Sequence, residues 1–151
     1  MKKFFLFLGM VGSLISYTSA YAKTTIVKNF ETAIAQCSDT FQIEDKQCSE
    51  TWSIKCHNYR MQANRNVQKC YKKIALDLFV NFYGLSETEA QERFDSFSNF
   101  IYNQYLFVFS ETKYCKENNC GTSLYLYSEY ATTQELQQYV NRIISSISAN
   151  N

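Results

Sequence analysis

Residues 48–82 read CSETWSIKCHNYRMQANRNVQKCYKKIALDLFVNF, and the predicted arrangement of the chain follows from them. Apolar and cysteine side chains recur in it every three or four residues, with no Pro or Gly between them. That spacing predicts one long amphipathic helix. Its apolar stripe comprises Cys48, Trp52, Cys56, Tyr59, Ala63, Val67, Cys70, Ile74, Leu78 and Phe82. We expect the helix to end near Tyr83, because Gly84 tolerates the left-handed backbone of a helix C-terminus.

Three cysteines lie on one face of this predicted helix. At about 1.5 Å per residue, Cys56 lies about 12 Å from Cys48 and about 21 Å from Cys70 along the axis. A disulfide requires Cα atoms within about 7 Å, so these cysteines are expected to pair with other segments. The remaining cysteines are Cys37, Cys115 and Cys120. An even number of cysteines without Cys-x-x-Cys spacing favours disulfides over a zinc site.

A second long helix is predicted directly after the first. Ser86 and Glu89 have the spacing of a capping box, in which each side chain bonds to the backbone of the other residue. An apolar stripe then runs from Ala90 to Cys115 at helical spacing. Two long helices joined by a short turn form an antiparallel hairpin.

The hairpin predicts one cysteine pair and leaves the others open. If the turn is centred near Leu85, the numbers of opposing residues sum to about 171, which places Cys56 opposite Cys115 as the best-supported pair. Two schemes remain for the other cysteines: Cys48–Cys120 with Cys37–Cys70, or Cys37–Cys48 with Cys70–Cys120. A local Cys115–Cys120 loop is the alternative if the helix that approaches Cys115 ends early.

The rest of the mature chain is expected to be helical with polar connections. Residues 25–37 predict a short helix, and residues 116–123 a polar loop with a turn at 119–121. A final helix is predicted over about 124–147, burying Tyr127, Ala131, Leu136, Tyr139 or Val140, Ile143 and Ile147. The fold class is therefore a disulfide-stapled all-α bundle of three to four helices, built on a long antiparallel helical hairpin.

The first 22 residues have the pattern of a bacterial export signal. Lys2 and Lys3 precede an apolar core, and Ala20-Tyr21-Ala22 is a small-x-small cleavage site. The apolar run is too short to span a bilayer, which takes about 20 residues. We therefore expect a single helical domain over residues 23–151, periplasmic or secreted, with no membrane span in the mature chain.

Charge and motifs argue against several classes of function. Without Lys2 and Lys3 the basic residues number 13 against 14 acidic ones, which does not favour nucleic acid as a partner. The single histidine, His57, has no recognisable nucleophile or orienting acid. Glycine occurs only at positions 9, 12, 84 and 121, which excludes a Gly-rich phosphate loop. The sequence thus predicts no enzyme, no cofactor and no metal.

Two surfaces are candidates for binding a protein partner. Arg65, Lys69 and Lys72 recur at helical spacing and predict a basic outward face. The segment 110–123 predicts a presented loop, whose polar groups are Glu111, Lys116, Glu117, Asn118 and Asn119. Aromatic residues are dense late in the chain. Most are expected in the core and the rest in an exposed patch: Tyr102, Tyr105, Phe107, Phe109, Tyr125, Tyr127 and Tyr130.

In outline the chain resembles the LprI-type lysozyme-inhibitor family. Cys37 and Cys48 resemble its early cysteine pair, and Gln104 and Cys115 have the separation of its Gln-x-x-Trp-x-x-Tyr-Arg-Asp-x-x-Cys segment. Within that segment Phe107 stands in place of Trp, and Ser110, Glu111 and Thr112 replace Tyr-Arg-Asp. Gly121-Thr122 resembles the loop before the family's last helix. The resemblance implies an exported, helical, non-enzymatic protein that binds a lysozyme. The alternative is a structural or accessory component of a cell-envelope or secretion assembly.

Overall fold

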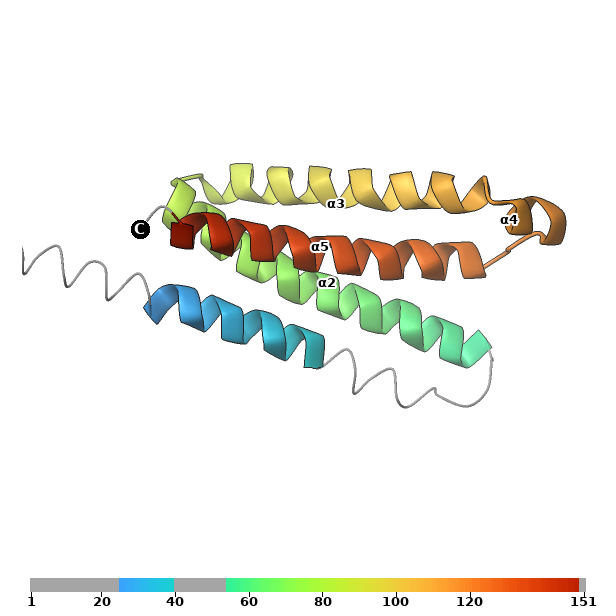
Figure 1. Cartoon of the computed structure of the whole chain (residues 1–151), viewed down its shortest axis with the longest axis horizontal. Helices are drawn as coiled ribbons and strands as arrows, with labels where there is room; N and C mark the ends of the chain where they lie inside the picture. The colour runs from blue at the N-terminus through green and yellow to red at the C-terminus, as the bar shows by residue number, and fades with distance from the viewer. Residues whose placement is uncertain (1–24, 40–53, 150–151) are drawn as a thin grey trace, which may run out of the picture.

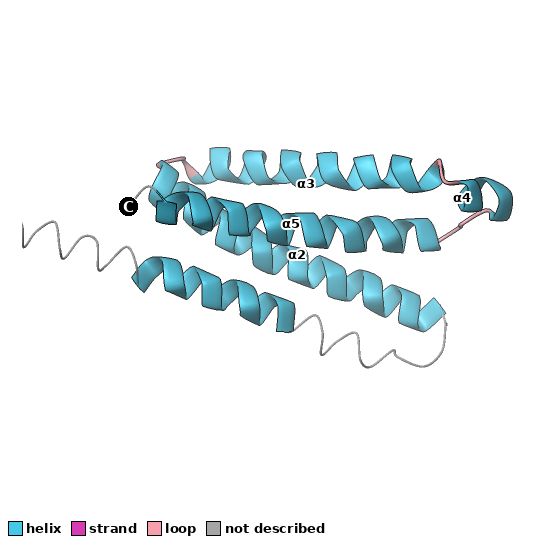
Figure 2. Cartoon of the chain, in the orientation of Figure 1, coloured by secondary structure: helices cyan, strands magenta, loops and turns pink. Residues whose placement is uncertain are grey.

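The described part of the chain is an all-α bundle, as the sequence predicts (Figures 1 and 2). The computed structural model describes residues 25–39 and 54–149. Its helices are helix 25–39, α2 (Ile54–Tyr83), α3 (Glu87–Ser110), α4 (Lys113–Asn118) and α5 (Ser123–Ala149). The predicted signal segment 1–22 and the predicted start of the long helix at Cys48 lie outside the described residues. None of the helices in these two ranges combines the length and hydropathy needed to cross a membrane.

Successive long helices run antiparallel, and α5 packs against both α2 and α3 (Figure 1). α2 and α3 meet at the turn around Gly84 and diverge towards the α4 end. Helix 25–39 lies along α2, where the rings of Phe30 and Phe82 are 6.2 Å apart. The bundle therefore has a broad core shared by several helices, rather than a seam between two.

The apolar core is concentrated in the half of the bundle that contains the Gly84 turn. Leu78 and Val140 are fully buried there, and the rings of Phe97 and Tyr139 stack at 4.1 Å. The buried apolar cluster comprises Val27, Ile34, Cys37, Val67, Tyr71, Ile74, Ala75, Leu78, Phe79, Ala90, Phe94, Leu136, Val140, Ile143 and Ile144. Removal of this apolar surface from water stabilises the bundle.

The turn from α2 to α3 has the predicted chemistry. Gly84 has a φ of +67°, in the left-handed region that glycine adopts without a steric penalty. Ser86 Oγ accepts a hydrogen bond from the backbone N–H of Glu89 at 3.3 Å, and the Ser86 backbone N–H donates to Glu89 Oε2 at 2.9 Å. The capping box is thus confirmed on both sides.

The predicted continuation of the second long helix to Cys115 is wrong. α3 ends at Ser110, because Thr112 is extended (φ −63°, ψ 145°) and caps a separate short helix. Thr112 Oγ1 accepts from the backbone N–H of Cys115 at 3.3 Å. The predicted turn that follows is confirmed, with positive φ angles at Asn119 and Gly121.

This early end of α3 also overturns the predicted pair Cys56–Cys115. Cys115 instead bonds to Cys120, with Cα atoms 4.7 Å apart, which is the local alternative. The two-helix register fails because α2 and α3 diverge and α5 packs against both.

Helix 25–39 and α2 are joined by the disulfide Cys37–Cys70, with Cα atoms 5.9 Å apart. This pair belongs to the first of the two predicted schemes. The pairs Cys48–Cys120, Cys37–Cys48 and Cys70–Cys120 are excluded by the two observed bonds. Cys56 is also disulfide-bonded.

Candidate functional site

The half of the bundle towards α4 has a polar interior. Over its first turns α5 buries Ser128, Glu129, Thr132 and Thr133, whereas the predicted core residue Tyr127 is 54% exposed. Tyr127 precedes Leu136 by nine residues, which places it about 180° from Leu136 around the helix axis. Towards the N-terminus of α5, the buried face that carries Leu136 and Val140 therefore consists of hydroxyl and carboxyl side chains.

Glu129 is the centre of a hydrogen-bonded network between α5 and α2. Its Oε1 accepts from Arg65 Nε at 2.9 Å, and its Oε2 accepts from Gln68 Nε2 at 2.9 Å. Gln68 Nε2 also lies 3.1 Å from Thr133 Oγ1, which in turn lies 2.9 Å from Asn64 Oδ1. Because only 8% of the Glu129 side chain is exposed, these partners offset the cost of burying its charge.

A polar cavity of about 310 Å³ adjoins this network, between α2, α3 and α5. Its lining residues are Arg65, Gln68, Ser98, Asn99, Tyr102, Glu129 and Thr132. Burial raises the pKa of Tyr102, and the nearby Glu129 carboxylate raises it further. The single histidine, His57, is buried in the same half of α2.

The three cations of the predicted basic face have different surroundings. Arg65 pairs with Glu129 of α5, and Lys72 Nζ lies 2.6 Å from Asp95 Oδ1 of α3. Lys69 lies between them in sequence and is exposed. Two of the three charges are therefore directed towards carboxylates on neighbouring helices, so they do not form one continuous basic surface.

The five polar groups of the predicted loop are all exposed, on and beside the short helix α4. Lys116 Nζ lies 2.6 Å from Glu111 Oε2, and Lys113 Nζ lies 3.7 Å from Glu117 Oε1. Asn118 Nδ2 donates to the carbonyl oxygen of Tyr114 at 3.1 Å. The segment is thus a structured, locally charge-balanced helix and turn, closed by Cys115–Cys120.

Exposed aromatic side chains are concentrated around α4, as the patch prediction allows. Tyr114 is 67% exposed and Phe107 is 66% exposed. Other rings of the late group are partly covered: Tyr105 stacks on Phe109 at 5.7 Å, and Phe109 packs against Tyr127 at 6.0 Å. We call Phe107, Val108, Tyr114, Tyr125 and Tyr127 the aromatic tip, since all are exposed where α3 leads through α4 into α5.

The Glu129 network could not be predicted from the spacing of apolar residues, because its members are polar. These polar residues nevertheless recur at helical spacing in the sequence. Ser128 and Thr132, like Glu129 and Thr133, are four residues apart in line with Leu136. Among residues 25–39 and 54–149, no group of His, Cys, Asp and Glu side chains is arranged to hold a metal ion. No protein-family model, curated protein or solved structure matches the chain.

Proposed function

We propose that this chain is an exported bacterial protein-binding module without enzymatic activity, and that the aromatic tip is its contact surface. The observation that carries the proposal is the exposure of Tyr114 and Phe107 beside a disulfide-closed segment. Large exposed apolar side chains in one region mark interaction surfaces. Aromatic side chains are enriched at protein interfaces and among the residues that dominate binding energy.

The backbone around Tyr114 is held in place before any partner binds. Thr112 caps α4, Asn118 bonds back to the carbonyl of Tyr114, and Cys115–Cys120 closes the turn. A segment fixed in this way loses little conformational entropy on docking. The disulfide spans a separation of only five residues, so its effect is local preorganisation more than cross-linking of the bundle.

The polar groups of the predicted loop form the rim of this surface. Glu111, Lys116 and Glu117 take part in ion pairs within the segment, and Asn118 and Asn119 lie at its end. Exposed pairs of this kind contribute little energy but help to fix orientation and partner choice.

The resemblance to LprI-type inhibitors supports a lysozyme as the partner. The export signal and the disulfides support a periplasmic or secreted location, because disulfides persist in oxidising compartments.

The test is inhibition of c-type and g-type lysozymes by the purified, oxidised protein, together with calorimetric titration. We expect inhibition at micromolar concentration, and at least a tenfold loss of affinity in Tyr114→Ala and in Phe107→Ala. A tenfold loss corresponds to about 1.4 kcal/mol, which is typical of a buried aromatic anchor. Ile26→Ala is the control, because Ile26 is exposed on helix 25–39. If neither lysozyme binds, or if Ile26→Ala weakens binding as much, the proposal for lysozyme is wrong.

A second candidate is a structural or accessory component of a cell-envelope or secretion assembly. The exposed aromatic tip favours it too, because the same surface would dock on an assembly subunit. Photo-crosslinking from position 114 in cells separates the two candidates. A crosslinked muramidase supports the inhibitor, and a crosslinked membrane or secretion component supports the assembly.

A further inference from the structure

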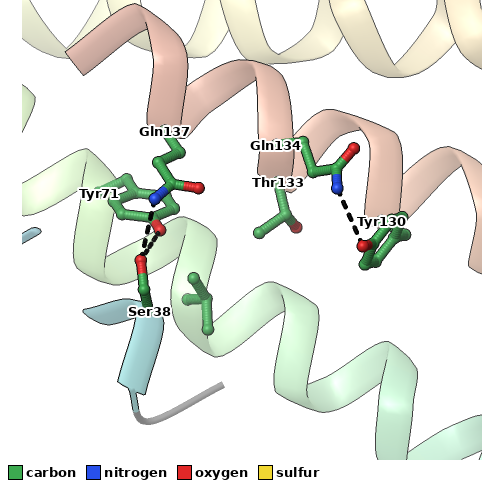
Figure 3. A pocket seen from close by; sticks show the side chains of 7 residues that line it. Ser38, Tyr71, Tyr130, Thr133, Gln134 and Gln137 are labelled. Atoms are coloured by element: carbon green, nitrogen blue, oxygen red, sulfur yellow. Dashed lines mark hydrogen bonds between the residues drawn. The ribbon is translucent and has the colours of Figure 1, made fainter. Parts of the chain in front are cut away.

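A second cavity lies between helix 25–39, α2 and α5, and involves none of the aromatic-tip residues (Figure 3). Its volume is about 280 Å³. Its lining residues are Ser38, Val67, Tyr71, Tyr130, Thr133, Gln134 and Gln137. All of them are uncharged, in contrast to the Arg65–Glu129 cavity on the other side of the network.

Hydrogen bonds between the lining residues fix the walls of this cavity. Ser38 Oγ and Tyr71 Oη are 2.8 Å apart, and Gln137 Nε2 donates to Ser38 Oγ at 3.1 Å. Gln134 Nε2 donates to Tyr130 Oη at 2.9 Å. Figure 3 shows Gln137 beside Tyr71 and Ser38, and Gln134 beside Tyr130, with Thr133 between the two groups. The site is thus formed before a ligand enters.

The fixed amides retain hydrogen-bonding capacity. A glutamine amide has one carbonyl oxygen and two N–H donors. In the described part of the chain, Gln134 and Gln137 each use one N–H in the bonds above and make no other side-chain hydrogen bond. Each amide therefore offers an acceptor beside a donor. Val67 and Tyr71 are almost fully buried beneath the cavity, and Tyr130 is the half-exposed aromatic ring beside it.

We propose that this cavity binds a neutral saccharide ring. A sugar hydroxyl both donates and accepts, which matches the paired donor and acceptor of a glutamine amide. The C–H face of a sugar ring matches the half-exposed ring of Tyr130. An ionic ligand would lose hydration without meeting an opposite charge, so the neutral lining disfavours it. The volume equals about nine water molecules at about 30 Å³ each, which accommodates one ring and leaves room for ordered water.

The test uses saturation-transfer NMR and titration of the oxidised, full-length mature protein with D-glucose and N-acetyl-D-glucosamine. We expect saturation of the ring protons and a dissociation constant of the order of 1 mM for a single ring. Gln134→Ala and Tyr130→Ala should each weaken binding about fivefold, the effect of losing about 1 kcal/mol of hydrogen bonding or ring contact.

A variant of α5 provides the matched control. Gln138→Ala removes the same side chain from an exposed position that does not line the cavity. It should bind sugar as the parent does. The proposal is overturned if neither sugar shows saturation, if Gln138→Ala weakens binding as much as Gln134→Ala, or if D-glucuronate binds as tightly as D-glucose. Lysozyme inhibition depends on the aromatic tip and should be the same in these variants as in the parent. It therefore distinguishes a failure of the proposed sugar site from a failure of the proposed contact surface.

Discussion

The Glu129 carboxylate is buried inside the bundle, and two side chains of α2 offset the cost of its desolvation. Arg65 donates a hydrogen bond to one of its oxygens and Gln68 to the other. The two ends of the ion pair are unequal, since 54% of the Arg65 side chain is exposed and 8% of the Glu129 side chain is. Removing the exposed partner leaves a charge in the interior, whereas removing the buried partner leaves a cation that water can solvate.

Arg65→Met should therefore destabilise the protein more than Glu129→Gln. We expect a loss of about 3 kcal/mol for Arg65→Met, the low end for breaking a buried pair, because Gln68 still bonds to Glu129. Glu129→Gln should cost about 1–2 kcal/mol, the price of one mismatched donor. Urea denaturation at neutral pH measures both. Glu92→Gln is the control on the exposed surface of α3 and should change stability by less than about 0.5 kcal/mol. An equal loss of stability in Arg65→Met and Glu129→Gln would contradict this argument from the unequal burial of the two side chains.

Single elements follow local rules closely, and the start of α3 is the clearest case. Glu89 receives hydrogen bonds from the side chain and the backbone N–H of Ser86, and these lower the pKa of its carboxyl from the ordinary value of 4.5. Because the pKa of Glu89 is lower in the folded state, its ionised carboxylate stabilises the folded protein at pH values above the ordinary pKa. This stabilisation is lost as the pH falls through the lower, folded-state pKa.

Ser86→Ala should cost about 1 kcal/mol at neutral pH, the usual effect of removing a serine N-cap. The difference from the parent should shrink below pH 4.5, because protonation of Glu89 removes part of the same cap in the parent. Denaturation curves across pH 3–7 check both statements. The control Ser96→Ala, at an exposed position inside α3, should be neutral or slightly stabilising. If the stability difference between Ser86→Ala and the parent did not change with pH, the two hydrogen bonds of the Ser86–Glu89 capping box would be independent of each other.

The elements that were predictable were those that local sequence specifies. The end of α2 at Tyr83, the start of α3 and the turn at Asn119 to Gly121 depend on glycine, caps and short spacings. The end of α3 was missed because Thr112 falls on the apolar stripe, so its role as an N-cap was not recognised. The buried face at the start of α5 could not be recognised from apolar periodicity, because it carries hydroxyls and a carboxylate.

The two described disulfides contribute differently to the bundle. Cys37–Cys70 joins two helices across a separation of 33 residues, and Cys115–Cys120 closes a turn across five. The pairing could not be derived from the sequence, because it depends on where α3 ends and on how helix 25–39 packs against α2. That arrangement is a property of the assembled bundle, not of any one helix.

The double variant Cys37→Ala/Cys70→Ala should lose more stability than Cys115→Ala/Cys120→Ala. Loop-closure entropy gives about 3.7 kcal/mol for the longer loop and about 2 kcal/mol for the shorter one. Guanidinium denaturation compares the two double variants. Lysozyme inhibition should show the opposite order, because the short loop supports the aromatic tip. Equal stability losses would contradict the entropic ranking, and full inhibition by the short-loop variant would contradict the role of the tip.

The disulfide Cys37–Cys70 lies beside the cavity proposed to bind a sugar. Ser38 and Tyr71 directly follow the two cysteines of Cys37–Cys70, so the cavity wall in Figure 3 is built from segments that this bond fastens together. In a chain whose thiols are reduced, helix 25–39 is held only by packing and by the hydrogen bonds of Ser38 with Tyr71 and Gln137. The proposed sugar affinity should therefore be higher in the oxidised protein than in the reduced one, so it would report whether Cys37–Cys70 has formed.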